Sequence, residues 1–281
     1  VFFGMFVGQL NKIIDRSMAS SVLEGGVSAL SYASIINNAV QEILVMGIVT
    51  ILFANSAEFV SKGQTDKVKS QLSNSMKYMT FLIVPACIGV FVLAEPIVKF
   101  VLCRGAFNEV SLKITAGALR CYTVGLLFLA VRDTLVKIFY AYKDTKTTTI
   151  VSTVSILCNI VLNIVLGKLI GINGLALATS ISSMVNCVAL FILLRNKIGD
   201  FGTKGILAVL TKSILGGLLM GVLAHFVNSI LVKNGYGLSA LIISVLAGLF
   251  IYLALGFIMK NEPMVKVVRM VKKKVQERKG A

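Results

Sequence analysis

The sequence predicts an all-α fold, a polytopic membrane bundle of about eight transmembrane helices. Hydrophobic residues make up 57% of the 281 residues and charged residues only 14%, with a mean hydropathy of +0.89. Soluble domains carry about 25% charged residues, whereas a bilayer-spanning helix needs about 20 mostly apolar residues. The stretches of that length leave no room for a soluble domain. They are residues 1–20, 31–55, 77–101, 115–142, 148–170, 173–194, 206–231 and 238–259.

Ionisable residues interrupt the early stretches. The first holds Asp15 and Arg16, the second holds Glu42, and the fourth holds Arg132 and Asp133. A charge at membrane depth costs roughly 3 kcal/mol and is kept mainly where it faces a bundle interior or a water-filled cavity. These residues therefore predict a polar pathway, and they favour transport over other functions.

Further local features lie in the first half of the chain. Pro85 falls inside the third stretch, where it removes a backbone hydrogen bond and predicts a kink. The polar segment 57–76 predicts a helical connector on the cytoplasmic side. In the fourth stretch, Asp133 and Lys137 have the i, i+4 spacing of an ion pair. Arg132 lies near the cytoplasmic end of this stretch. Its side chain could therefore extend to the membrane interface, which is the alternative to a role in a cavity.

The fifth and sixth stretches are polar along one face. Asn159 and Asn163 are four residues apart, and Thr179 leads a run of hydroxyl side chains after a glycine-bearing turn. In the first stretch, Asn11 and Asp15 share a face in the same way. Such oxygens suit a hard cation such as sodium. The alternative is that Asn and Ser hold membrane helices together, at about 0.6 kcal/mol each, and spacing alone favours this alternative.

The last two stretches differ from the others because they are almost purely apolar. Gly217 and Gly221 have the GxxxG spacing that permits close helix approach. We therefore divide the chain into three parts. Residues 1–200 are the first part, residues 201–260 are an added helix pair with a possible groove for a lipid tail, and residues 261–281 are a basic tail.

In the tail, Met264, Val267 and the valines that follow predict an amphipathic helix on an anionic leaflet. The alternative is that the Lys and Arg residues of the tail act only as the positively charged flank that stops the last span at the cytoplasmic side.

The net charge of +16 reflects membrane topology and does not indicate nucleic-acid binding. Lys and Arg gather in alternate loops and in the tail, which predicts a multi-pass protein with both ends of the chain in the cytoplasm. The chain begins inside an apolar stretch and lacks the features of a signal peptide, so we expect it to start partway through a longer protein. The loops expected outside carry only Arg104, Lys113, Lys168 and Lys233.

Enzymatic chemistry is not indicated. The five cysteines show no CxxC spacing and the single histidine has no partner motif, so neither a zinc site nor a disulfide framework is expected. A membrane-embedded polyprenyl-phosphate transferase would need clustered carboxylates for a metal-bound diphosphate. The 12 acidic residues are scattered and form no DxxxD-like pattern. We expect no enzyme and no cofactor, apart from a coupling ion.

Four segments in order resemble the lipid II flippase family of the MurJ/MviN type. They are QLNKIIDRSMAS with GGVSALSYA, PIVKFVLCRGAF and FYAYKDTKT. The resemblance covers most of residues 1–200, and later residues match by position and hydropathy only. The family belongs to the multidrug/oligosaccharidyl-lipid/polysaccharide exporter superfamily and typically has fourteen spans in two six-helix lobes plus two extra helices. The resemblance implies that this chain is the second lobe plus that pair, with the N-terminal lobe missing.

The family is understood to move lipid II, the undecaprenyl-diphosphate-linked peptidoglycan precursor, outward across the bacterial cytoplasmic membrane by alternating access. Cavity residues would meet the substrate, and the candidates are Arg16, Glu42 and Arg132. Arginine can bind a diphosphate in bidentate fashion. The resemblance also implies a sodium site, with a Leu175 carbonyl as a further ligand. Its residues are Asp15, Asn159, Asn163, Leu175 and Thr179.

Three positions depart from the family pattern. Ile35 stands where members commonly have an arginine after the SALxYA segment, Asn163 is acidic in some members, and Thr148 replaces the usual proline. The first departure implies that one expected diphosphate contact is absent or that another residue such as Arg16 covers it, and the second implies a weaker sodium site. The rival functions are a polysaccharide-unit flippase or cation-coupled drug exporter of the same superfamily, and a non-transporting scaffold of the cell-wall machinery.

Overall fold

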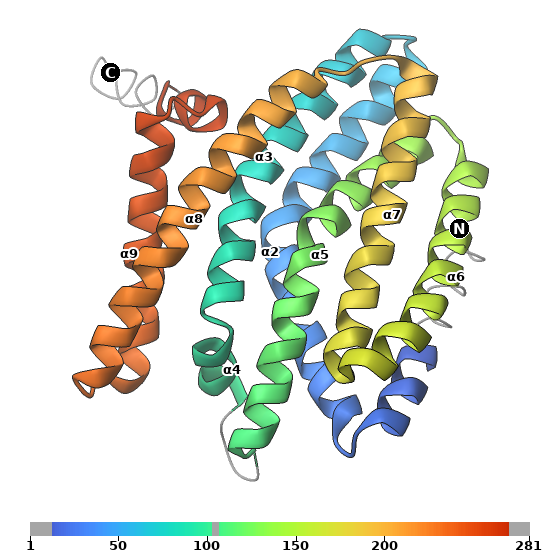
Figure 1. Cartoon of the computed structure of the whole chain (residues 1–281). Helices are drawn as coiled ribbons and strands as arrows, with labels where there is room; N and C mark the ends of the chain where they lie inside the picture. The colour runs from blue at the N-terminus through green and yellow to red at the C-terminus, as the bar shows by residue number, and fades with distance from the viewer. Residues whose placement is uncertain (1–12, 103–106, 270–281) are drawn as a thin grey trace.

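The computed structural model describes residues 13–102 and 107–269, and every regular element in this part is an α-helix. The helices form a bundle with α8 and α9 at one edge and α6 at the opposite edge (Figure 1). In chain order they are residues 13–22, α2 (Gly26–Ser61), α3 (Thr65–Val92), α4 (Ala94–Leu102), α5 (Glu109–Ala141), α6 (Thr145–Ile170), α7 (Ile172–Ile198), α8 (Thr203–Lys233), α9 (Gly237–Ile258) and residues 262–269.

Seven of the described helices are long and apolar enough to cross a membrane, namely α2, α3 and α5 to α9. They confirm the predicted helical membrane fold. Most of the first predicted span, residues 1–20, lies outside the described residues. The helices expose large apolar side chains, including Ile43, Leu169 and Phe250, which are 82%, 72% and 75% exposed. Exposed apolar surface on this scale suits contact with lipid.

Two predicted boundaries are wrong. Segment 57–76 is not a separate connector: α2 continues to Ser61 and α3 begins at Thr65, so only a short turn separates two long helices. Lys, Gln and Glu are good helix formers, so the predicted helical character of the segment is correct, but its residues belong to the ends of α2 and α3 on either side of the turn. The third predicted span is two helices, because α3 ends at Val92 and α4 begins at Ala94. Pro85 lies inside α3, which continues through it.

Side-chain caps fix where α5 and α6 begin. Asn108 accepts a hydrogen bond from the Ser111 amide at 2.9 Å, and Asp144 accepts one from the Thr147 amide at 3.1 Å. Such caps satisfy amides that have no partner within the helix. The loops 62–64, 142–144 and 199–202 lie at one end of the bundle (Figure 1). The basic loops of the predicted topology therefore share one side.

The turn between α6 and α7 brings these two helices very close together. Gly171, with φ of 62°, is the only residue between them. A Cβ on Gly174 would lie 2.0 Å from the backbone oxygen of Leu166. Only glycine fits at such a contact between two backbones. The polar faces of α6 and α7 are therefore held against each other.

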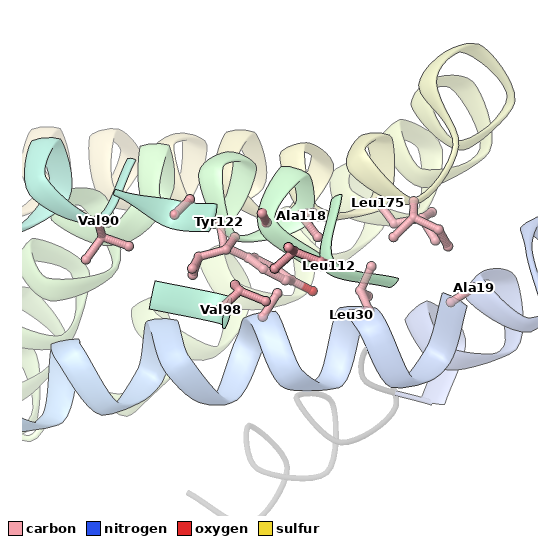
Figure 2. Close-up of a cluster of buried hydrophobic side chains, with 14 residues drawn as sticks. Ala19, Leu30, Val90, Val98, Leu112, Ala118, Tyr122 and Leu175 are labelled. Carbon is pink, nitrogen blue, oxygen red and sulfur yellow. The ribbon is translucent and has the colours of Figure 1, made fainter. Parts of the chain in front are cut away.

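An apolar cluster holds helix 13–22 against the rest of the bundle. Figure 2 shows Leu30 of α2, Tyr122 of α5 and Leu175 of α7 in this cluster, together with Ala19 of helix 13–22. Ala19 and Leu175 are fully buried. Because Ala19 lies one turn after Asp15, the cluster also fixes the face of the helix that carries the carboxylate.

The predicted GxxxG spacing in α8 does permit close packing, but the partner is α3. A Cβ on Gly217 or Gly221 would lie 2.6 or 2.7 Å from the side chain of Ile88 in α3. α9 packs along α8 and also contacts α3, where the Tyr252 hydroxyl donates to the Phe81 carbonyl at 2.7 Å. The last two long helices thus pack on the α3 side of the bundle.

Candidate functional site

The polar centre of the bundle begins with Asp15. This residue is 8% exposed, and its Oδ1 accepts a hydrogen bond from Nδ2 of Asn163 at 2.6 Å. The same Asn163 nitrogen donates to Oδ1 of Asn159 at 3.0 Å. The i, i+4 spacing on α6 places both amides on one face, and the cluster around Ala19 turns Asp15 towards that face. Three of the five residues predicted to hold sodium are therefore in direct contact.

The network continues onto α7. Nδ2 of Asn159 donates to the hydroxyl of Ser182 at 3.3 Å, and that hydroxyl donates to the Thr179 carbonyl at 3.0 Å. The Thr179 hydroxyl donates to the Leu175 carbonyl at 3.2 Å. The two remaining residues of the predicted set thus join the network through Ser182. Sequence reasoning left Ser182 out of the set, although its position three residues after Thr179 places it on the same face.

The donor set fits a monovalent hard cation. It offers one carboxylate, two amide groups, a hydroxyl and a backbone carbonyl, and oxygen donors of this kind bind sodium-like ions. One carboxylate balances one positive charge at a buried position. The groups come from helix 13–22, α6 and α7, so an ion held among them would join three helices.

Asp133 takes part in a different arrangement from the one predicted. Its Oδ1 accepts from the guanidinium of Arg132 at 2.6 Å, and its Oδ2 accepts from Nε2 of Gln41 at 2.7 Å. Lys137, the predicted partner, instead lies with its ammonium nitrogen 5.4 Å from the ring centroid of Phe53. The bond from Gln41 links α2 to α5 and could not be read from local spacing.

The three candidate substrate-binding residues differ in how far their side chains are exposed. Arg16 and Glu42 are exposed on the described part of the chain, on helix 13–22 and α2. Ile35, which stands where a basic residue was expected, is 62% exposed. Asn38 is exposed between Ile35 and Glu42 on the same helix. The Arg132 side chain is only 31% exposed and is paired with Asp133.

A polar cavity of about 350 Å³ lies between α5, α6 and α7. Asn159, Thr179 and Ser182 line it, so the cavity adjoins the Asp15 network. Arg132 and Asp133 line it from α5. Sequence reasoning did not single out several other lining residues, whose only signal is their helical spacing from predicted ones. They are Ser152, Ser155 and Asn186.

A second cavity of about 380 Å³ is almost wholly apolar. It lies between α2, α3, α8 and α9, and Pro85, Gly89, Met220 and Gly248 are among its lining residues. It lies beside the last two long helices, α8 and α9.

These features coincide with a family match over most of the chain. The family model described as "Lipid II flippase MurJ" matches residues 1–246. The chain belongs to this family. A probable lipid II flippase MurJ of Bdellovibrio bacteriovorus is 26% identical over 268 residues, which is 95% of this chain and 51% of the relative. The Thermotoga maritima relative is 28% identical, over 96% of this chain and 54% of its own length.

Solved structures agree with the family match. A lipid II flippase MurJ in an inward closed conformation superposes with a TM-score of 0.76 at 26% identity, covering 92% of this chain and 52% of that chain. A MOP superfamily transporter from Pyrococcus furiosus superposes with a TM-score of 0.62 at 16% identity, over 97% and 66% of the two chains, and shares the fold. The chain spans about half the length of the curated relatives it matches.

Proposed function

We propose that this chain forms the C-terminal lobe and the added helix pair of a lipid II flippase. The protein carries the undecaprenyl-diphosphate-linked peptidoglycan precursor across the bacterial cytoplasmic membrane by alternating access, with residues 1–200 as the lobe. The observation that carries the proposal is the buried Asp15–Asn163–Asn159 network, at the crossing of helix 13–22 with α6, in a member of this family. Both ends of the chain lie in the cytoplasm.

Asp15, Asn159, Asn163, Thr179 and the Leu175 carbonyl hold the coupling sodium ion. The fit of the donor set described above supports this assignment. Because helix 13–22 and α6 supply the carboxylate and the amides, these residues tie the position of helix 13–22 to the presence of the ion. The ion supplies a positive charge that favours one arrangement of the three helices over another.

Arg16 and Glu42 contact the polar headgroup. Both are exposed on the described helices, as residues facing a cavity between two lobes would be. An exposed guanidinium can bind a diphosphate through two parallel hydrogen bonds. Arg132 is a third candidate, and Asp133 holds its guanidinium in place. With Ile35 at the position of an expected base, Arg16 carries the larger share of the contact.

The apolar cavity beside α8 and α9 receives the lipid tail. Its lining is suited to an isoprenoid chain because burial of each CH₂ contributes about 0.8 kcal/mol. The basic tail contacts anionic lipid headgroups at the cytoplasmic surface. Its first two turns, residues 262–269, also pack on the bundle, where Lys266 donates to Asn74 at 2.9 Å. The other half of the transporter supplies the opposite wall of the substrate cavity.

Complementation in bacteria depleted of their own lipid II flippase tests this proposal in the complete protein. Wild type should restore growth, while Asp15→Asn and Arg16→Ala should fail at equal membrane abundance. Asp66→Asn and Arg195→Ala are matched controls, because their side chains are 100% and 54% exposed, and both should rescue. Failure of a well-expressed wild type would reject lipid II flipping in favour of a polysaccharide flippase, a drug exporter or a scaffold.

A further inference from the structure

The polar cavity extends away from the Asp15 network over a substantial depth. It is lined by α6 from Asn159 back to Ser152 and by α7 from Thr179 on to Asn186. Each stretch covers eight residues, whose seven steps span about 10 Å of helix. A volume of about 350 Å³ is far more than the roughly 10–15 Å³ that one water needs on this measure. The cavity is therefore a water-sized route from the network towards the end where α5 finishes and α6 begins.

The hydroxyl groups that line the cavity present acceptors to it. Ser155 donates its proton to the Val151 carbonyl at 2.9 Å, and Ser183 donates its proton to the Thr179 carbonyl at 2.7 Å. A hydroxyl has one proton and two acceptor lone pairs. With that proton directed to the backbone of its own helix, each hydroxyl has only lone pairs left for the cavity. Such a surface interacts favourably with cations and with the protons of water.

Asn186 provides an independent sign that the cavity is built for a polar occupant. The residue is 5% exposed and lines the cavity, and its Oδ1 is buried with no hydrogen-bond partner among the described residues. A buried acceptor left without a partner costs about 1–3 kcal/mol. Water in the cavity, alone or as part of the shell of a cation, satisfies this oxygen, and an apolar lipid tail does not.

At the end of the cavity away from Asp15, the positive and negative side-chain charges balance each other. Arg132 and Asp133 form an ion pair at 2.6 Å, and Gln41 holds the other carboxylate oxygen at 2.7 Å. The lining therefore has no net charge and many weak oxygen donors. A route for ions needs sites that are favourable enough to enter and weak enough to leave, and this lining meets both conditions.

We propose that this cavity is the passage through which the sodium ion at Asp15 exchanges with the cytoplasmic side, with the Asn186 amide oxygen as a transient ligand on the way. The identity of the ion and of the side rests on the proposed function. The passage itself is read from the cavity, its acceptors and the orphaned oxygen.

Cysteine accessibility tests the passage in the complete protein. In a background with the native cysteines replaced by alanine, Ser155→Cys and Asn186→Cys are exposed to a membrane-impermeant cationic methanethiosulfonate. Val154→Cys and Val185→Cys are the matched controls, since these neighbours are 55% and 40% exposed on the outer surface of the helices. Both cavity cysteines should react at least tenfold faster than the controls from the cytoplasmic side, and sodium should slow their reaction.

Sodium release provides the second measurement. Asn186→Leu removes the oxygen at similar size, whereas Asn186→Ser keeps one. Equilibrium binding of radioactive sodium by purified protein should change less than twofold in either variant. The rate of sodium dissociation after dilution should fall at least fivefold in Asn186→Leu and recover in Asn186→Ser. A merely structural role for Asn186 would instead lower affinity in both variants.

The outcomes separate the two proposals. If Asp15→Asn abolishes sodium binding while the cavity cysteines react no faster than the controls, the passage is wrong and the ion site stands. If the wild type binds no sodium, both the ion site and the passage are wrong. Lipid II flipping is judged separately, by complementation.

Discussion

Replacement of Gly174 by alanine is the sharpest test of how the candidate ion site is built. The new Cβ would lie 2.0 Å from the Leu166 oxygen and 2.4 Å from the Leu166 carbonyl carbon, and Cβ contacts under 3.0 Å essentially never occur. The obstacle is backbone, so no side-chain rotation relieves it. α6 and α7 must therefore move apart by about 1 Å, and overpacking on this scale costs about 3 kcal/mol.

The displacement reaches the ion site because the site is close. Asn163 lies three residues before Leu166, about 4.5 Å along α6, and Thr179 lies five residues after Gly174, about 7.5 Å along α7. Metal-ligand distances tolerate deviations of only about 0.2 Å. We therefore expect Gly174→Ala to lower sodium affinity at least tenfold and to lower the unfolding temperature of the purified complete protein.

The assay pairs sodium binding with thermal unfolding and uses Gly89→Ala as its control. A Cβ on Gly89 would meet only the Met220 methyl group, at 3.6 Å, which is an ordinary contact. That variant should bind sodium within twofold of wild type. If Gly174→Ala unfolds at the wild-type temperature and binds sodium normally, the close approach of α6 and α7 does not build the site, and the reasoning fails.

Three further predictions concern stability. Tyr252→Phe removes the hydrogen bond to the α3 backbone, so the unfolding temperature should drop by the equivalent of about 1 kcal/mol. Asp144→Ala removes the cap of α6 and should cost about 1 kcal/mol, which chemical unfolding will show, whereas Asp144→Asn keeps a capping oxygen and should lose less. Hydrogen bonds from Lys266 and a second lysine lower the pKa of Glu262. This stabilisation exists above the unfolded pKa of about 4.3 and is lost as pH falls through the lower folded value. Hydrogen-exchange protection in 262–269, corrected for the intrinsic exchange rate at each pH, should therefore fall below about pH 4, and Glu262→Gln should remove that fall.

The sequence was sufficient for the helical membrane fold and for part of the candidate site. Asn159 and Asn163 could be placed on one face because helical periodicity is a local property. Their contact with Asp15 joins residues 148 positions apart, and only the family resemblance indicated it. Periodicity alone favoured the view that these amides merely hold helices together.

The features that were missed depend on long-range packing. Local spacing predicted an ion pair between Asp133 and Lys137. In the structure, Gln41 of α2, which is 92 residues earlier in the chain, donates to the Asp133 carboxylate instead. The break between α3 and α4 does have a local signal, because Glu95 and Pro96 lie in the first turn of α4, but the apolar residues on both sides made the two helices read as one span. The cavity beyond Asn159 arises because the side chains of three helices do not fill the space between them. The sequence of one helix alone cannot predict such a space.

The length of α2 has a mechanical consequence. Its 36 residues form a rod of about 54 Å, whereas the hydrocarbon core of a bilayer is about 30 Å thick. A rotation of such a rod by about 10° displaces one end relative to the other by about 9 Å. Because α2 is unbroken from Gly26 to Ser61, a small tilt about its midpoint moves its two ends in opposite directions. Glu42, near its midpoint, would lie close to the fulcrum and travel least.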